Sequence, residues 1–194
     1  SVEISPDENY IAFSVDKSGD SVCNIYYKEF FNNKLHLVNM NHKNWYGDNN
    51  TINTKHINNG DFRWSRKFFR IYYITVDSVS LRENKLWYVD LDTGDKSLIY
   101  EEKDEIFSIN LSVTDDAEYI ILSSLSKDCV DSYIIEEYSN DAVVRCVFNK
   151  YEKTKYLLNH FGGIWYILII KGNNTEIVIS YDLKEFNIFI PYKK

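Results

Sequence analysis

The chain has 194 residues, of which 44% are hydrophobic and 16% aromatic, and this apolar content excludes a chain that is disordered throughout. Its 29 acidic and 22 basic residues give a net charge of −7 and are spread along the sequence, which argues against a nucleic-acid partner, because phosphate binding needs a clustered basic face. The negative charge favours solubility, and attraction of basic substrates toward a pore is the alternative. Sixteen Tyr, eleven Phe and only two Pro favour strands, so we expect an all-β protein.

The cysteine pattern and the apolar runs narrow the class of protein further. Cys23, Cys129 and Cys146 lack C-x-x-C spacing, so the sequence indicates neither a disulfide framework nor a zinc ribbon, and we expect reduced thiols. The apolar run 164–170 has the length of a strand, far below the ~20 residues that a transmembrane helix needs. We therefore expect a soluble, cytoplasmic protein with no membrane partner.

A repeated pattern organises the chain. The sequence apolar-x-apolar-Ser occurs three times, each time followed by a short polar turn and an apolar segment with the composition of a strand. A fourth apolar segment of this kind is preceded by a degenerate form of the apolar-x-apolar-Ser pattern, and we call this pattern the lead-in of each repeat. The three lead-ins are 2–5, 62–65 and 109–112, and the four strands are expected at 10–15, 71–76, 119–122 and 165–170.

Two further strands are expected in each repeat. The second strand ends in an acidic residue followed by an apolar one, and these pairs recur at intervals of 45 to 61 residues. The pairs are 29–30, 90–91, 137–138 and 182–183, and the third strands are expected at 35–38, 97–100, 143–147 and 188–190. Each repeat is therefore expected to be a meander of short antiparallel strands.

A repeat of roughly 40 to 50 residues built from four strands is the sequence signature of a propeller blade. We therefore predict that residues 1–194 form a single partial β-propeller domain of about four blades, each a three- to four-stranded antiparallel meander. The blades are expected to start near residues 5, 65, 112 and 160. The extra length of the first repeat falls in an Asn-rich loop at 39–60, which we expect on the surface. Four such blades either close a small ring or make up about half of a larger one.

Three segments resemble the propeller of the prolyl oligopeptidase family of serine peptidases, nearest its oligopeptidase B branch. Segment 71–87 (IYYITVDSVSLRENKLW) is similar to a blade in which a Tyr-rich strand meets an Asp, a Leu-Arg turn and a strand with basic and aromatic residues. Segment 97–107 (SLIYEEKDEIF) looks like the linker that follows it, and the Ser-Pro-Asp turn in 5–16 also matches. The resemblance covers residues 1–126 well and the remainder weakly.

The resemblance implies a seven-bladed propeller above an α/β-hydrolase domain, where it admits short peptides to a Ser-Asp-His triad and excludes folded proteins. It further implies a parent peptidase that cleaves after basic residues, with that hydrolase domain and short peptide substrates as partners. The sequence itself has no Gly-x-Ser-x-Gly elbow, so we expect no catalytic residue in this chain. The Asn-rich insertion is a departure from the family.

Other candidate sites are interpreted as structural, and we expect no cofactor-binding and no metal-binding residue. His36, His42, His56 and His160 have no neighbours that indicate a triad or a metal face. The run 16–20 is interpreted as a hairpin turn rather than a calcium loop, because further ligands are missing. The acidic run 101–105 is interpreted as a charged linker between blades, with presentation of carboxylates to a basic substrate as the alternative.

Two further patterns are interpreted without a functional role. The sequences that begin at Asn49, Asn110 and Asn173 fit the glycosylation pattern, which an Asn-rich chain contains by accident. The aromatic residues of the second strands are interpreted as packing between blades rather than as a stacking platform for a ligand. These residues are Tyr26, Tyr27, Trp87 and Tyr88.

Two functions from different classes follow from the sequence. The first is the substrate-gating propeller portion of an oligopeptidase B-like peptidase. The alternative is a stand-alone propeller module that binds another protein and has no catalytic activity. In either case, exposed blade faces predict self-association of this chain.

Overall fold

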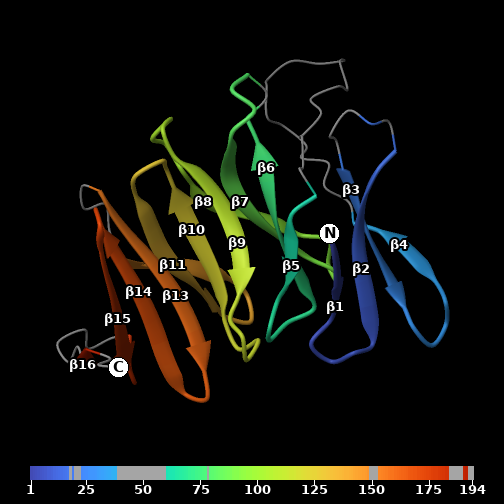
Figure 1. The fold of residues 1–194 in the computed structure, drawn as a ribbon. Coiled ribbons are helices and arrows are strands. Elements are labelled where there is room, and N and C mark those ends of the chain that lie inside the picture. Colours follow the sequence, from blue (N-terminus) through green and yellow to red (C-terminus); the bar gives the residue numbers. More distant parts are fainter. Residues whose placement is uncertain are drawn as a thin grey trace. The chain divides into compact units, whose positions relative to one another are not determined.

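The structure is a computed structural model, and it describes residues 1–17, 19, 23–38, 60–77, 79–148, 153–183 and 190–191. These residues form sixteen β-strands (Figure 1). No helix in this part of the chain is long and apolar enough to cross a membrane. The prediction of an all-β fold is confirmed.

The strands fall into four consecutive groups of four. The first blade contains β1 (Val2–Ile4), β2 (Tyr10–Asp16), β3 (Cys23–Glu29) and β4 (Leu35–Leu37). The second contains β5 (Phe62–Trp64), β6 (Arg70–Val76), β7 (Glu83–Asp90) and β8 (Lys96–Glu101). The third contains β9 (Ser108–Val113), β10 (Ile120–Leu125), β11 (Val130–Glu137) and β12 (Ala142–Phe148). The fourth contains β13 (Thr154–Phe161), β14 (Ile164–Lys171), β15 (Asn174–Ser180) and β16 (Ile190–Pro191).

Each blade is an antiparallel meander in which consecutive strands pair. The third and fourth blades are also joined by one parallel pair, between Val130 of β11 and Lys155 of β13. Beside it, the Ser132 hydroxyl donates a hydrogen bond to the carbonyl oxygen of Tyr156 at 2.6 Å. The predicted partial propeller of four-stranded meanders is confirmed, and the parallel pair is a feature that the repeat pattern did not predict.

Alternating burial explains why these segments form strands. In β7, Asn84, Leu86 and Tyr88 are buried, whereas the residues between them are partly exposed. Side chains point to opposite faces of a strand in turn, so this pattern places one face of β7 in the core. By contrast, β6 is buried at six of its seven residues, which fits a strand with neighbours on both sides and covered faces.

The chain divides into two compact units. The first comprises Ser1–Ser65 and Phe69–Glu101, and the second comprises Arg66–Phe68 and Glu102–Lys194. The first unit therefore contains the strands of the first two blades, and the second contains those of the last two. Each pair of blades has a hydrophobic core of its own.

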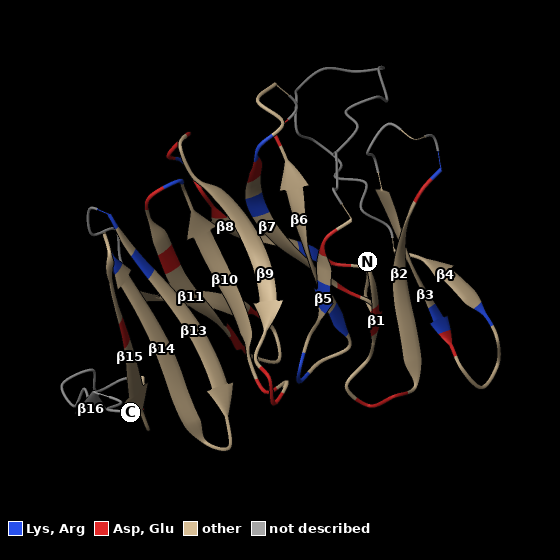
Figure 2. Ribbon diagram, in the orientation of Figure 1, with Lys and Arg blue, Asp and Glu red and all other residues tan. Residues whose placement is uncertain are grey.

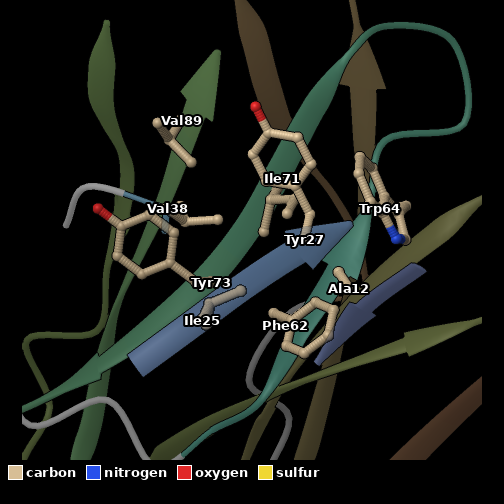
Figure 3. Close-up of a cluster of buried hydrophobic side chains, with 9 residues drawn as sticks. All are labelled: Ala12, Ile25, Tyr27, Val38, Phe62, Trp64, Ile71, Tyr73 and Val89. Carbon is tan, nitrogen blue, oxygen red and sulfur yellow. The ribbon is translucent and has the colours of Figure 1, made fainter. Parts of the chain in front are cut away.

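The core of the first unit lies between its two blades (Figure 3). Strands β2 and β3 provide side chains from the first blade, and β5, β6 and β7 provide them from the second. An isolated blade would leave this face in water, so the two blades stabilise each other. The buried residues are Ala12, Ile25, Tyr27, Val38, Phe62, Trp64, Ile71, Tyr73 and Val89.

The core of the second unit is built in the same way. Ile134 of β11 packs with Trp165 and Ile167 of β14, Val178 of β15 and the buried Leu183. The expected blade positions 112 and 160 lie near the ends of β9 and β13, and positions 5 and 65 directly follow β1 and β5.

One strand ends earlier than expected, and most of one expected loop lies outside the described residues. The second strand of the fourth blade was expected to run to 182–183, but β15 ends at Ser180. The Ser180 hydroxyl donates to the carbonyl oxygen of Asp182 at 2.8 Å and accepts from its amide at 3.3 Å, which turns the chain out of the sheet. In the expected Asn-rich loop, residues 39–59 lie outside the described part of the chain, as do 188–189 of the expected last strand.

Gly60 provides a test of the packing beside β2 and β3. Its φ is +86°, and a Cβ atom there would lie 2.9 Å from the Ser14 hydroxyl and 3.0 Å from the Cys23 sulfur. We expect Gly60→Ala to lower the free energy of unfolding by about 2–3 kcal/mol, through backbone strain and this overlap together. Gly94→Ala is the control, because Gly94 has a φ of +77° and open space around it, and we expect a loss of about 1 kcal/mol from strain alone. Equal losses in urea denaturation would contradict this account.

Candidate functional site

The turn between β1 and β2 holds the start of β2 in place. The Ser5 hydroxyl donates to Asp7 Oδ1 at 2.5 Å and accepts a hydrogen bond from the Tyr10 amide at 2.9 Å. Asn9 also binds this carboxylate, because its side-chain amide donates to Asp7 Oδ2 at 2.8 Å. Glu8 has a φ of 58°, as this tight turn requires. The turn thus fixes the direction in which Tyr10 leaves it.

The turn between β9 and β10 repeats this construction in the third blade. The Thr114 hydroxyl donates to Asp116 Oδ1 at 2.8 Å and accepts from the Tyr119 amide at 3.1 Å. Ala117 has a φ of 59°, equivalent to that of Glu8. At the position of Asn9, however, the third blade has Glu118. The two turns therefore share their backbone but differ in charge.

In the first unit, the tyrosine that follows the turn packs against the neighbouring blade. The ring of Tyr10 lies 4.7 Å from that of Phe69 and 6.1 Å from that of Trp64, measured between centroids. Tyr27 packs edge-on against the same three rings. The Trp64 indole also donates to the carbonyl oxygen of Glu3 at 3.1 Å, so the junction has a polar tie as well as aromatic contacts.

In the second unit, the equivalent tyrosine contacts a histidine. The Tyr119 ring lies 4.8 Å from the His160 ring in an edge-on arrangement and 4.7 Å from that of Trp165. His160 Nδ1 lies 2.6 Å from Asp116 Oδ2 and 3.7 Å from Glu118 Oε2. These three residues are the one group within the described ranges whose His, Cys, Asp or Glu ligand atoms could hold a metal ion.

The environment of Asp116 favours its charged form. Burial raises the pKa of this carboxyl, but hydrogen bonds from the Thr114 hydroxyl, the Glu118 amide and His160 outweigh that effect and hold the pKa below its usual value. The turn therefore presents a carboxylate to the imidazole. Figure 2 shows acidic colour in the turn between β9 and β10.

Sequence reasoning gave His160 no role, because its partner Asp116 lies 44 residues away in the chain and local spacing carries no signal for such a pair. A comparison of the two turns would have provided one signal, since an acidic residue replaces Asn9 at position 118. Of the other histidines, His36 stacks on Tyr27 with centroids 4.6 Å apart. His42 and His56 lie outside the described residues.

Tyr27 packs in the core between the first two blades as expected, and Trp87, which is only partly buried, packs against that core. Tyr27 and Tyr88 are buried, and the Trp87 indole donates to the Thr75 hydroxyl at 3.0 Å. Tyr26 differs, because it points to the opposite face of its strand from Tyr27, where it stacks with Phe13.

The acidic run 101–105 is only partly the charged linker that the sequence predicted. Glu101 is the last residue of β8 and forms an ion pair with Lys85 at 3.3 Å. Glu102 is buried, and it accepts hydrogen bonds from the Ser124 hydroxyl at 2.5 Å and the Asp104 amide at 2.9 Å. A buried carboxylate needs such donors, and no local pattern distinguishes it from its exposed neighbours.

The remaining candidates have ordinary turn or strand positions where they are described. The Gly19 amide donates to Asp16 Oδ1 at 2.8 Å, as in a hairpin turn, and Ser18 and Asp20 lie outside the described residues. Asn110 lies within β9, and Asn173 lies in the turn between β14 and β15. Asn49 is outside the described residues.

Comparison with known proteins shows which protein family contains this repeat. The family model described as "Prolyl oligopeptidase, N-terminal beta-propeller domain" matches residues 1–189. A curated relative, "Protease 2" of Moraxella lacunata, is 29% identical over 115 residues, which make up 58% of this chain and 16% of that protein.

Solved structures show the same fold. Oligopeptidase B from Leishmania major matches with a TM-score of 0.70 and 21% identity over 93% of this chain and 24% of its own. Oligopeptidase B from Trypanosoma brucei, in a closed form with covalently bound antipain, matches with a TM-score of 0.69 over the same shares, also at 21% identity. The chain thus spans less than a quarter of the length of these relatives.

The aromatic junction of the first unit can be tested by truncation. We expect Tyr10→Ala to lower the free energy of unfolding by about 2–4 kcal/mol, because the ring leaves a cavity among Trp64, Phe69 and Tyr27. Phe31→Ala is the matched control: this ring is 86% exposed, and its loss should change stability by no more than about 0.5 kcal/mol. A junction variant as stable as the control would show that the contact does not hold the blades together.

The Asp7 turn should make stability depend on pH. The Ser5 hydroxyl is the main cause that holds the pKa of Asp7 below its usual value. A depressed carboxyl pKa stabilises the fold fully above the unfolded value of about 4, and this contribution is lost as the pH falls through the lower folded value. We expect the stability difference between the wild type and Asp7→Asn to be constant from pH 6 to 8 and to shrink below about pH 4. Urea denaturation across this range measures it, and a difference independent of pH would refute the role of the charge.

Proposed function

This chain belongs to the prolyl oligopeptidase family, as part of its N-terminal β-propeller domain, and we propose that it is the substrate-gating portion of an oligopeptidase B-like serine peptidase. The peptidase would cleave short peptides after basic residues. The observation that carries this proposal is the match of the family's propeller model to residues 1–189, together with the fold shared with two oligopeptidase B structures.

The proposed mechanism for this chain is steric selection. In the proposal, the four blades form one continuous part of a propeller ring that stands above an α/β-hydrolase domain, which supplies the serine nucleophile. The aromatic contacts of the first blade pair, and the shared sheet and aromatic contacts of the second, resist separation of neighbouring blades, so in the proposal the ring does not widen for a bulky substrate. An extended peptide would pass through its centre, whereas a folded protein would not.

Charge supports the preference for basic substrates. The chain carries a net charge of −7, and an acidic surface raises the local concentration of cationic peptides. Such long-range attraction raises the rate at which enzyme and substrate meet and leaves the chemical step unchanged. Salt screens it. The proposal therefore assigns this chain to selection and delivery, and bond cleavage to another part of the parent protein.

The proposal is tested with the full-length gene product. Its reading frame should encode a Gly-x-Ser-x-Gly elbow beyond this chain, and the purified protein should hydrolyse a short fluorogenic peptide with Arg at the cleaved bond. We expect kcat/KM for the Arg peptide to exceed that for a matched Pro peptide by at least about tenfold. The same Arg sequence placed within a folded domain should stay intact.

Each alternative outcome has a definite meaning. Preference for the Pro peptide would overturn the proposed basic specificity while leaving a peptidase. Cleavage of the folded substrate at the rate of the short peptide would overturn steric selection. A gene product without a hydrolase domain would overturn the peptidase assignment and favour an interaction module.

A further inference from the structure

Two turns with the same backbone hold their carboxylates in different ways. In the first blade, the carboxylate of Asp7 is stabilised by hydrogen bonds from two uncharged donors, the Ser5 hydroxyl and the Asn9 side-chain amide. In the third blade, Glu118 takes the place of Asn9. Glu118 thus places a second carboxylate where the first turn has a hydrogen-bond donor. The candidate ligand atoms of Asp116 and Glu118 lie within 4.8 Å of each other, and two negative charges this close repel unless a cation lies between them.

The third blade also has a histidine at this place. His160 Nδ1 lies 2.6 Å from Asp116 Oδ2 and 3.7 Å from Glu118 Oε2. The three candidate ligand atoms all lie within 4.8 Å of one another. His160 Nδ1 can donate to only one of these carboxylates, and Glu118 Oε2, at 3.7 Å, lies beyond hydrogen-bond distance from it.

We propose that Asp116, Glu118 and His160 bind a divalent transition-metal ion of the zinc class, which ties the β9–β10 turn of the third blade to strand β13 of the fourth. One imidazole nitrogen and two carboxylate oxygens form a donor set that suits zinc. Zinc bonds of about 2.0–2.2 Å place tetrahedral ligands roughly 3.3–3.5 Å apart, between the two observed distances. The two pairs that include His160 therefore need to move by less than about 1 Å, and the Asp116–Glu118 pair, which lies within 4.8 Å, needs to close by no more than about 1.5 Å.

The surroundings of the three side chains suit a metal site. The His160 ring is buried and is fixed by Tyr119 edge-on and by Trp165 with centroids 4.7 Å apart, so Nδ1 faces the two carboxylates. Asp116 is oriented through its other oxygen by the Thr114 hydroxyl, which is the kind of outer contact that supports metal ligands. Glu118 is 60% exposed, so an ion can enter from solvent and complete its coordination with water.

The competing explanation is a hydrogen bond from His160 to Asp116 with Glu118 left in solvent. The two explanations differ in what Glu118 does. A metal site needs its carboxylate, whereas a simple hydrogen-bonded pair is indifferent to it. This difference makes Glu118 the informative position, and its exposure makes substitution there harmless to the fold.

The experiment is calorimetric titration of the chelator-treated chain with zinc chloride, in a Cys146→Ser background because that exposed thiol is an alternative zinc ligand. We expect binding of one ion per chain and a rise in Tm with zinc, because the ion links two elements of the folded state. Glu118→Gln should weaken zinc binding by at least about tenfold. Asp115→Asn, which removes an exposed charge from the same turn without removing a ligand, should bind as the parent does.

Two further variants keep the proposal open to contradiction. Glu118→Asn restores the residue type of the first turn, so it should keep the fold and Tm without zinc while losing the Tm rise with zinc. His160→Gln should also abolish binding, and its circular dichroism spectrum checks that the strands persist. Absence of zinc binding, or equal binding by Glu118→Gln and the parent, would overturn the proposal and leave a hydrogen-bonded pair. The result does not depend on the proposed peptidase function.

Discussion

The fold depends on a tyrosine that follows a tight acidic turn and packs into the neighbouring blade. A four-stranded blade has apolar residues on its faces and cannot bury them alone, so contact between blades supplies the stability. Tyr10 makes this contact with Trp64 and Phe69 in the first unit. Tyr119 makes it with His160 and Trp165 in the second. In both units, the hydroxyl-carboxylate pair of the turn sets the start of the following strand, which begins at Tyr10 in the first unit and directly after Tyr119 in the second.

The repeat could be predicted from the sequence because the strands and turns of each blade follow the same local sequence pattern. The repeated apolar-x-apolar-Ser pattern and the apolar segments that follow it predicted the strands, and polar turns and acidic-apolar pairs marked their ends. Interactions between distant residues could not be predicted in this way. The buried Glu102 depends on Ser124, and the His160 cluster depends on a turn in another blade. The end of β15 at Ser180 depends on a side-chain hydrogen bond that competes with the sheet.

The two junctions show how a repeat acquires a specific site. The first is built from aromatic rings, and the carboxylate of its turn, Asp7, accepts hydrogen bonds from uncharged donors. The second keeps the same turn and the same tyrosine but carries a histidine and an additional carboxylate. Departures from a local rule are expected where a structure has been adapted to a task. This contrast distinguishes the proposed ion site from the rest of the scaffold.

A structure of the full-length protein that contains this chain is the measurement that tests the central claim most directly. The account predicts that the four meanders are consecutive blades of one ring, with an α/β-hydrolase domain covering one end. Blades arranged as an open stack, or a ring without a hydrolase domain beside it, would contradict the proposal that this chain selects substrates for a peptidase.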